Sequence, residues 1–169
     1  NETSYFGRGS RVELVNEIKT RGFKKVLFVT DQTLLDCGVA GKVTKVLDDA
    51  GIAYEVFADV KPNPTVSNVQ DGLKKCREMG ADAIVTVGGG SAMDTAKGIS
   101  IIMTNPDRED VVSLNGLSNT LNKGMPVIAL PTTHGTAAEV TINYVITDEE
   151  RQIKMVCVDP NDIPVLAIV

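Results

Sequence analysis

The chain has 169 residues, of which 43% are hydrophobic and only 4% aromatic, so it is long enough to bury an aliphatic core in one globular domain. The net charge of −5 and isoelectric point near 4.9 argue against a nucleic-acid partner, because no basic face offsets the excess of Asp and Glu. The three cysteines show no C-x-x-C spacing, which indicates neither a disulfide framework nor a zinc site and favours a reduced, cytoplasmic setting. No apolar run approaches the roughly 20 residues that span a bilayer, so we expect no membrane partner.

Short β-branched runs alternate with amphipathic helical segments along most of the chain. Strands are predicted at Val26 to Thr30, Tyr54 to Ala58, Ala83 to Val87 and Val127 to Leu130. Helices are predicted at Arg11 to Arg21, Val39 to Ala50 and Val66 to Met79, ending at Gly22, Gly51 and Gly80. This alternation predicts parallel strands joined by right-handed crossovers, and therefore a Rossmann-like, doubly wound, mostly parallel α/β sheet.

The pattern changes after Leu130. Two β-branched runs, Ile142 to Thr147 and Ile153 to Val158, flank the polar residues 148–152 and predict a β-hairpin near the C-terminal end. A further strand is predicted to begin at Leu166 and to run to Val169. No repeat or linker divides the sequence, so we expect residues 1–169 to form one domain.

A glycine-rich turn, Gly88-Gly89-Gly90, joins the third predicted strand to a helix-forming segment. Glycines let the backbone approach a diphosphate closely, and the N–H groups that open the next helix stabilise the anion. Ser91 and Asp94 form an S-x-x-D capping box that would set the start of this helix. A tight turn without a ligand is the alternative interpretation.

This turn differs from the common sequence motifs of nucleotide and hydrolase sites. Met93 stands where the last glycine of G-x-G-x-x-G is required, and the G-K-[ST] of a Walker loop is absent. The segment around Ser91 also lacks the second glycine of a G-x-S-x-G nucleophile elbow, so hydrolase chemistry is not supported.

Polar residues follow three other predicted strands. Asp31 comes directly after the first strand, where its carboxylate could bind an adenosine ribose and repel a 2′-phosphate, or cap a short turn through Gln32 to Leu35. Asn63 lies between two prolines that are expected to hold it extended, so that its amide faces a ligand or closes a turn.

The segment Pro131 to Thr136 follows the fourth strand and is rich in hydroxyl groups, which suit diphosphate or ribose contacts or the capping of a helix. It contains the only histidine, His134. A catalytic metal role for His134 is not supported, because the sequence offers no H-E-x-x-H motif, paired histidine or cysteine cluster.

Three motifs in this order resemble the iron-containing (group III) alcohol dehydrogenases. They are GGGSAMDTAK at Gly88 to Lys97, PNPT at Pro62 to Thr65 and PTTHGTAAEVT at Pro131 to Thr141. The resemblance runs over the whole chain. It implies the N-terminal cofactor domain of an NAD-dependent enzyme, with a dehydroquinate synthase-like fold, and a helical C-terminal domain whose Asp and His residues bind Fe²⁺. Those ligands would lie beyond Val169.

The resemblance also implies roles for particular residues. Asp31 would select NAD over NADP, Asn63 would contact the cofactor, and Lys154 would reach the ribose near the nicotinamide. The remaining cofactor-binding residues would surround the diphosphate, and they are Gly89, Gly90, Ser91, Asp94, Thr132, Thr133 and Thr136. The sequence departs from the family pattern at His134, where a small residue is usual, and at Ala92, where proline is frequent.

For the intact enzyme the resemblance implies hydride transfer between nicotinamide and a small aldehyde, giving a diol or alcohol, with Fe²⁺ polarising the carbonyl oxygen. It implies a homodimer and assigns no catalytic residue to this chain. Two alternatives remain open: a stand-alone nucleotide-binding module without catalysis, and the cofactor domain of a glycerol dehydrogenase-like enzyme or a dehydroquinate synthase-like lyase.

Overall fold

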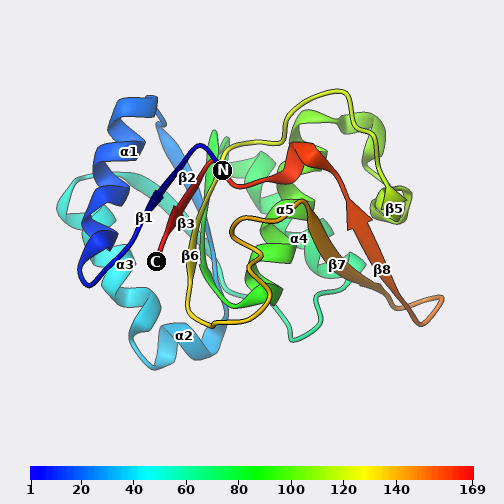
Figure 1. Cartoon of the computed structure of the whole chain (residues 1–169), viewed down its shortest axis with the longest axis horizontal. Helices are drawn as coiled ribbons and strands as arrows, with labels where there is room; N and C mark the ends of the chain where they lie inside the picture. Colours follow the sequence, from blue (N-terminus) through cyan, green and yellow to red (C-terminus); the bar gives the residue numbers. More distant parts are fainter.

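A six-stranded sheet forms the centre of the computed structural model, which describes residues 1–169 (Figure 1). The strand order is β1-β9-β6-β4-β2-β3, and every neighbouring pair is parallel. The strands are β1 (Thr3–Tyr5), β2 (Lys25–Val29), β3 (Ala53–Phe57), β4 (Ala83–Gly88), β6 (Val127–Pro131) and β9 (Leu166–Ile168). All residues of β4 are buried, as expected of a central parallel strand that is covered on both faces.

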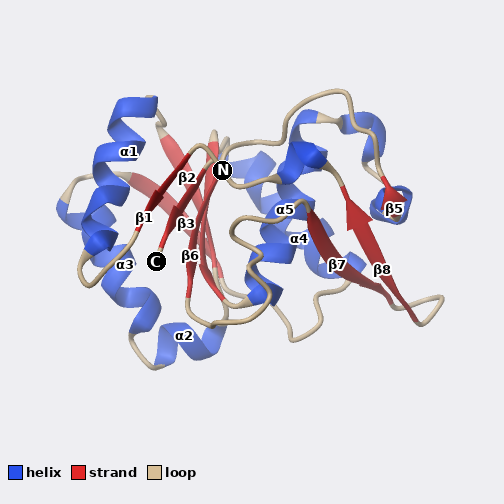
Figure 2. Cartoon of the chain, in the orientation of Figure 1, coloured by secondary structure: helices blue, strands red, loops and turns tan.

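Helices cover both faces of this sheet (Figure 2). The helices are α1 (Glu13–Arg21), α2 (Gln32–Asp36), α3 (Val39–Asp49), α4 (Val66–Met79) and α5 (Gly90–Thr104). Side chains of α1 and α3 pack in one hydrophobic cluster, and side chains of α4 and α5 pack in another on the opposite face. The connections after β2 and β4 therefore lead to opposite sides of the sheet, which is where open α/β sheets leave a crevice at their carboxyl ends.

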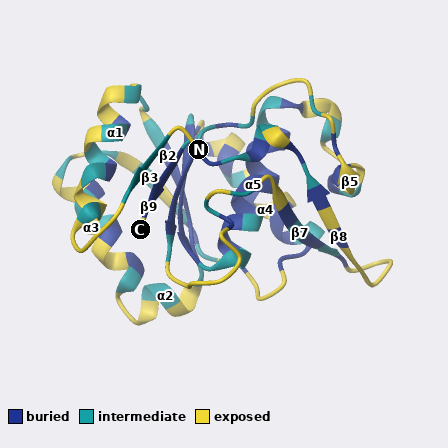
Figure 3. Cartoon of the chain, in the orientation of Figure 1, coloured by how far each residue is buried: buried dark blue, intermediate teal, exposed yellow.

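A small second sheet lies on the outer side of α5. It contains β5 (Gly116–Leu117), β7 (Asn143–Asp148) and β8 (Ile153–Val158), and β7 and β8 form an antiparallel hairpin. Tyr144, Ile146 and Met155 of the hairpin join the same hydrophobic cluster as Ile99 of α5. Helix α5 is therefore enclosed between two sheets, and Figure 3 shows it buried at the centre of the molecule.

Short 3-10 turns complete the chain, at Ser10–Val12, Pro106–Arg108, Val111–Leu114 and Pro160–Asp162. No helix has both the length and the apolar character that a membrane crossing requires.

The predicted α/β class, the parallel sheet and the hairpin are confirmed, with most element ends displaced by one or two residues. The bounds of α4 and β8 agree with the prediction, and Gly22 and Gly80 end their helices in the left-handed conformation. Three elements escaped prediction because they are too short to show a period: β1, α2 as a helix, and β5.

The expectation that Asn63 is extended is wrong. Its φ is 54°, in the left-handed region, although a proline follows it. Asparagine tolerates this region better than most residues, and here the side chain is held by a partner from the hairpin, Lys154. Tertiary contact therefore outweighs the local preference imposed by Pro64.

Candidate functional site

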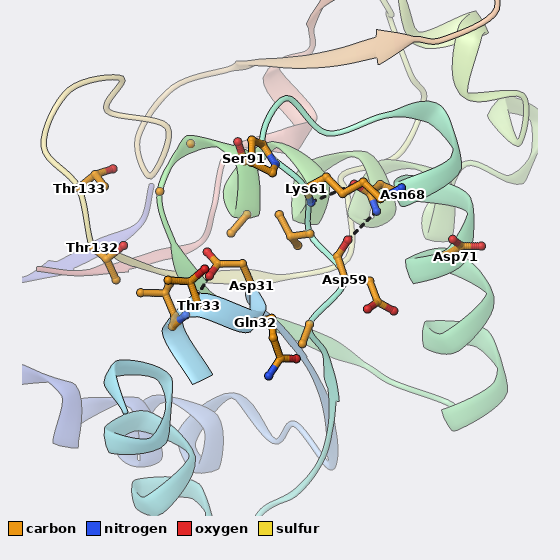
Figure 4. A pocket seen from close by; sticks show the side chains of 17 residues that line it. Asp31, Gln32, Thr33, Asp59, Lys61, Asn68, Asp71, Ser91, Thr132 and Thr133 are labelled. Atoms are coloured by element: carbon orange, nitrogen blue, oxygen red, sulfur yellow. Dashed lines mark hydrogen bonds between the residues drawn. The ribbon is translucent and has the colours of Figure 1, made fainter. Parts of the chain in front are cut away.

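A cleft with a volume of about 910 Å³ opens at the carboxyl ends of β2, β3, β4 and β6 (Figure 4). Its walls come from the segments that follow these strands, together with one side of α4. The lining residues are Asp31, Gln32, Thr33, Leu34, Ala58, Asp59, Val60, Lys61, Pro62, Asn68, Asp71, Gly89, Gly90, Ser91, Ala92, Thr132 and Thr133. Topology alone therefore brings together residues that are a hundred positions apart.

In the turn between β4 and α5 the backbone of Gly88 lies very close to the side chain of Ala92. A Cβ on Gly88 would lie 2.6 Å from the Cβ of Ala92, a distance that no side chain can occupy. The carbonyl of Gly88 accepts a hydrogen bond of 2.9 Å from the N–H of Thr132, which holds the loop after β6 beside the turn. Glycine at position 88 is thus required by packing within the protein, whatever the cleft binds.

Helix α5 begins at Gly90, and Gly89 is its N-cap without any side-chain hydrogen bond. The predicted capping box is wrong, because the carboxylate of Asp94 turns away from the helix start and accepts the N–H of Val145 on β7 at 3.1 Å. The first N–H groups of an α-helix have no acceptor within the helix. Here they remain uncapped at the floor of the cleft, where they favour an anion.

Asp31 caps α2, one of the two roles that the sequence left open, and it also lines the cleft. Its Oδ1 accepts a hydrogen bond of 2.9 Å from the N–H of Leu34 and caps α2. Its Oδ2 has no hydrogen-bond partner within the chain and lies beside Gly88, inside the cleft. One carboxylate oxygen therefore fixes the side chain, and the other is free to accept a hydrogen bond from a ligand.

The wall that follows β3 is fixed by Asn68 of α4, a residue that was not among the predicted site residues. The side chain of Asn68 is only 2% exposed; its amide donates to the carbonyl of Asp59 at 2.8 Å, and its oxygen accepts the N–H of Lys61 at 3.1 Å. Figure 4 shows these two bonds and the side chains of Asp31 and Asp59 in the same cleft. A polar residue on the buried side of an amphipathic helix was the sequence signal for this role.

The hydroxyl-rich loop after β6 lies over the glycine turn. Thr132 and Thr133 line the cleft, and the Thr133 hydroxyl would be 2.9 Å from a Cβ on Gly89. The Thr136 hydroxyl would be 3.4 Å from a Cβ on Gly90. His134 of this loop is exposed and lines a separate small hollow, so it does not crowd the main cleft.

Two other predicted residues, Asn63 and Lys154, meet each other outside the lining of the cleft. The Nζ of Lys154 donates to Oδ1 of Asn63 at 2.9 Å. The N–H of Thr147, which is paired with Lys154 across the hairpin, donates to the carbonyl of Pro64 at 2.8 Å. The hairpin is thus attached to the segment that forms one wall of the cleft.

Behind the turn lie three charged side chains, of which Lys97 and Asp162 are buried and Asp94 is partly buried, and only Asp94 was a predicted site residue. Lys97 of α5 is fully buried, its Nζ lies 3.8 Å from Oδ1 of Asp162, and burial lowers its pKa. Burial raises the pKa of Asp162 to about 7 and that of Asp94 to about 6. A lysine inside the apolar run from Ala96 to Ile102 was the sequence signal for this group.

No three or more His, Cys, Asp or Glu side chains of residues 1–169 gather in a way that could hold a metal ion. His134 has no partner ligands. The residues present therefore do not fit an iron site.

Comparisons with known proteins agree with this geometry. The family model described as "Iron-containing alcohol dehydrogenase" matches residues 1–169. Lactaldehyde reductase of Escherichia coli K12 is 54% identical over the whole chain, which spans 44% of that protein's length. Within this family we expected a resemblance to lactaldehyde reductase from the three motifs, and this identity confirms it.

Solved structures show the same fold. A 1,3-propanediol oxidoreductase matches with a TM-score of 0.93 and 38% identity, over 98% of this chain and 43% of its own. Sulfoacetaldehyde reductase from Bifidobacterium kashiwanohense, solved in complex with NAD⁺, matches with a TM-score of 0.88 and 31% identity, over 99% of this chain and 44% of its own. The chain thus spans less than half the length of the relatives it matches.

Replacing Gly88 with alanine should lower the free energy of unfolding by about 1–3 kcal/mol, because the added methyl group overpacks the turn against Ala92. Gly135→Ala is the matched control, since a Cβ there meets nothing within 4 Å. Urea unfolding of both variants measures the effect. Equal stability of the two variants would show that the turn can move without cost.

The buried carboxyl of Asp162 should make stability depend on pH. Because its folded pKa of about 7 exceeds its ordinary value of 3.8, the native state binds the proton more tightly, and its contribution to stability falls as pH rises between these values. Unfolding of the parent chain and of Asp162→Asn at several pH values checks this. Between pH 3.8 and about 7 we expect the free energy of unfolding of the parent to fall relative to that of the variant, and above this range the difference should stay constant. If the two free energies change with pH in parallel, the pKa of Asp162 is not raised.

Proposed function

Because the chain belongs to the iron-containing alcohol dehydrogenase family, we propose that residues 1–169 bind NAD in the cleft described above and that the protein interconverts a small aldehyde and an alcohol or diol. The substrate class is suggested by the relatives, among which are a lactaldehyde reductase and a 1,3-propanediol dehydrogenase. A lactaldehyde-like aldehyde is therefore the proposed substrate.

One observation carries the cofactor proposal: the uncapped start of α5 faces the cleft directly behind a glycine turn. The free N–H groups and the positive end of the helix dipole suit the diphosphate of a dinucleotide. Gly89 and Gly90 line the cleft without side chains of their own, and a Cβ on either would meet Thr133 or Thr136. Thr132 and Thr133 also line the cleft, the hydroxyl groups of Thr133 and Thr136 lie next to Gly89 and Gly90, and these three threonines are the proposed further donors.

Asp31 provides the proposed selectivity for NAD over NADP. The capping bond to Leu34 fixes the carboxylate, and its free Oδ2 accepts hydrogen bonds from the ribose hydroxyl groups. A 2′-phosphate at the same place would meet a fixed negative charge, with Asp59 as a second carboxylate lining the cleft.

When bound, the dinucleotide supplies or accepts a hydride at its nicotinamide ring. The role of residues 1–169 in that step is to hold and orient the dinucleotide. The glycine turn and α5 hold its diphosphate, and Asp31 holds its ribose. Asn63 and Lys154 are proposed to contact the cofactor from the hairpin side, where the lysine ammonium already donates to the Asn63 amide. No residue of the chain is assigned to the carbonyl group of the substrate.

We further propose that Fe²⁺ acts in the protein through ligands other than residues 1–169, as part of a helical domain. We also propose that the protein is a cytoplasmic homodimer. The family resemblance supports the iron site, the helical domain and the homodimer, and the cysteine pattern supports the cytoplasmic setting.

Asp31→Ser should narrow the preference for NADH over NADPH by about tenfold or more, equivalent to ~1.4 kcal/mol, because the charge is removed. Serine is also a good N-cap, so the variant should keep the start of α2 and the stability of the parent. Calorimetric titration with both cofactors measures the preference. If the parent chain binds both equally well, Asp31 is only a capping residue.

Gly90→Val should abolish NADH binding with only a small loss of stability, because the branched side chain would enter the space proposed for the diphosphate. Thr136, the nearest neighbour of the added Cβ, lies on an exposed loop that can yield. NADH fluorescence titration and urea unfolding measure the two effects, with Gly135→Ala as the control. A variant that binds NADH normally would remove the glycine turn from the site.

A further inference from the structure

Lys97 makes an unusual set of contacts for a lysine. Its side chain is 0% exposed, and its Nζ donates to the carbonyl of Thr141 at 2.7 Å and to the carbonyl of Asn143 at 3.1 Å. The Thr141 hydroxyl lies 3.4 Å from the same nitrogen. All these acceptors belong to the short segment that leads into β7.

Asp94 adds a contact one helical turn earlier. Its carboxylate accepts the N–H of Val145 at 3.1 Å. Asp94 and Lys97 are three residues apart and share one side of α5, so together they contact three alternate residues of the neighbouring segment, Thr141, Asn143 and Val145. The backbone groups of Asn143 and Val145 lie on the edge of β7 that faces α5, and Thr141 precedes that strand, so one side of the helix reaches all three.

This attachment fixes one end of the loop that covers the glycine turn. We call residues 132–142 the threonine loop. Its first residue, Thr132, is held by the carbonyl of Gly88 at 2.9 Å, and its last residues are held through Lys97. Between these ends residues 132–137 are exposed, and they include the hydroxyl groups that approach Gly89 and Gly90.

A lysine suits this task for a chemical reason. Its ammonium group has three N–H donors and reaches several carbonyl groups at once, whereas an apolar side chain would leave those carbonyl groups without a donor. Burial of the charge is unfavourable, and the Asp162 carboxylate at 3.8 Å offsets part of that cost. Of the titratable groups around Lys97, Asp94 lies on its own helix, Asp162 on the last 3-10 turn and Glu139 in the threonine loop.

We propose that Lys97 is a positioning residue that holds the threonine loop over the glycine turn and thereby sets the affinity of the cleft for its nucleotide. This proposal rests on the proposed NAD-binding function. Lys97 does not line the cleft, and its bonds to the carbonyl groups of Thr141 and Asn143 are the proposed route of its effect on binding.

The test compares Lys97→Met with Ser100→Ala. Ser100 is the matched control: it lies on the same helix, is 1% exposed, and donates a hydrogen bond of 2.7 Å to the carbonyl of Met125, at the other end of β6 from the cleft. Both variants should lose stability. Only Lys97→Met should weaken NADH binding, by about tenfold or more, and speed amide exchange of residues 132–145 by a similar factor. Lys97→Gln keeps two N–H donors and should lie between the parent and Lys97→Met.

Hydrogen–deuterium exchange separates this proposal from the proposed function, because it needs no nucleotide. If the parent chain binds no NADH, the proposed function fails, and exchange of residues 132–145 still decides whether Lys97 holds the loop. If amide exchange of residues 132–145 is the same in Lys97→Met as in the parent, the proposal is overturned. It is also overturned if the parent binds NADH and Lys97→Met shows faster exchange but the same NADH affinity. If Lys97→Met does not fold, Lys97→Gln is measured by the same two methods and judged by the same outcomes.

Discussion

The structure depends on a steric constraint at one point, the approach of Gly88 to Ala92 where β4 turns into α5. The space for a Cβ at Gly88 is already filled, so the chain can leave the central strand and enter the helix within one residue, Gly89. This abrupt turn places the helix start at the edge of the sheet, where its N–H groups face the cleft. A longer connection would move those groups away from the strand ends and would leave the space to side chains.

Helix α5 then links the two parts of the molecule. Its start forms the floor of the cleft, and its apolar side chains pack against the central sheet. Its partly buried Asp94 and buried Lys97 attach the hairpin and the threonine loop. Buried charges are unfavourable unless paired, and here each one is held by backbone groups or an opposite charge. The helix therefore carries polar contacts in its interior that fix the loops around the site.

Several residues that line the cleft also hold the fold together. Asp31 caps α2 with one oxygen and leaves the other in the cleft, so the two interpretations of this residue were never exclusive. The three glycines of the turn have different surroundings. Gly88 is required by packing against Ala92, whereas Gly89 and Gly90 border the cleft and the threonine loop. Asn68 is buried, and it shapes the cleft only through its hydrogen bonds to the backbone of Asp59 and Lys61.

The sequence by itself determined the α/β class, the parallel sheet, the hairpin and the strand ends that form the cleft, because hydrophobic period and helix-ending glycines are local signals. Only the tertiary structure decided the rest. The direction of Asp94, the left-handed backbone of Asn63 and the burial of Lys97 all depend on partners in the hairpin, some 40 to 90 positions away in the chain. Local rules placed Asp94 in a capping box and Asn63 in an extended loop, and contacts with Val145 and Lys154 overrode both. A residue's partner across the fold is set by how the layers pack, and no pattern within a single segment carries that information.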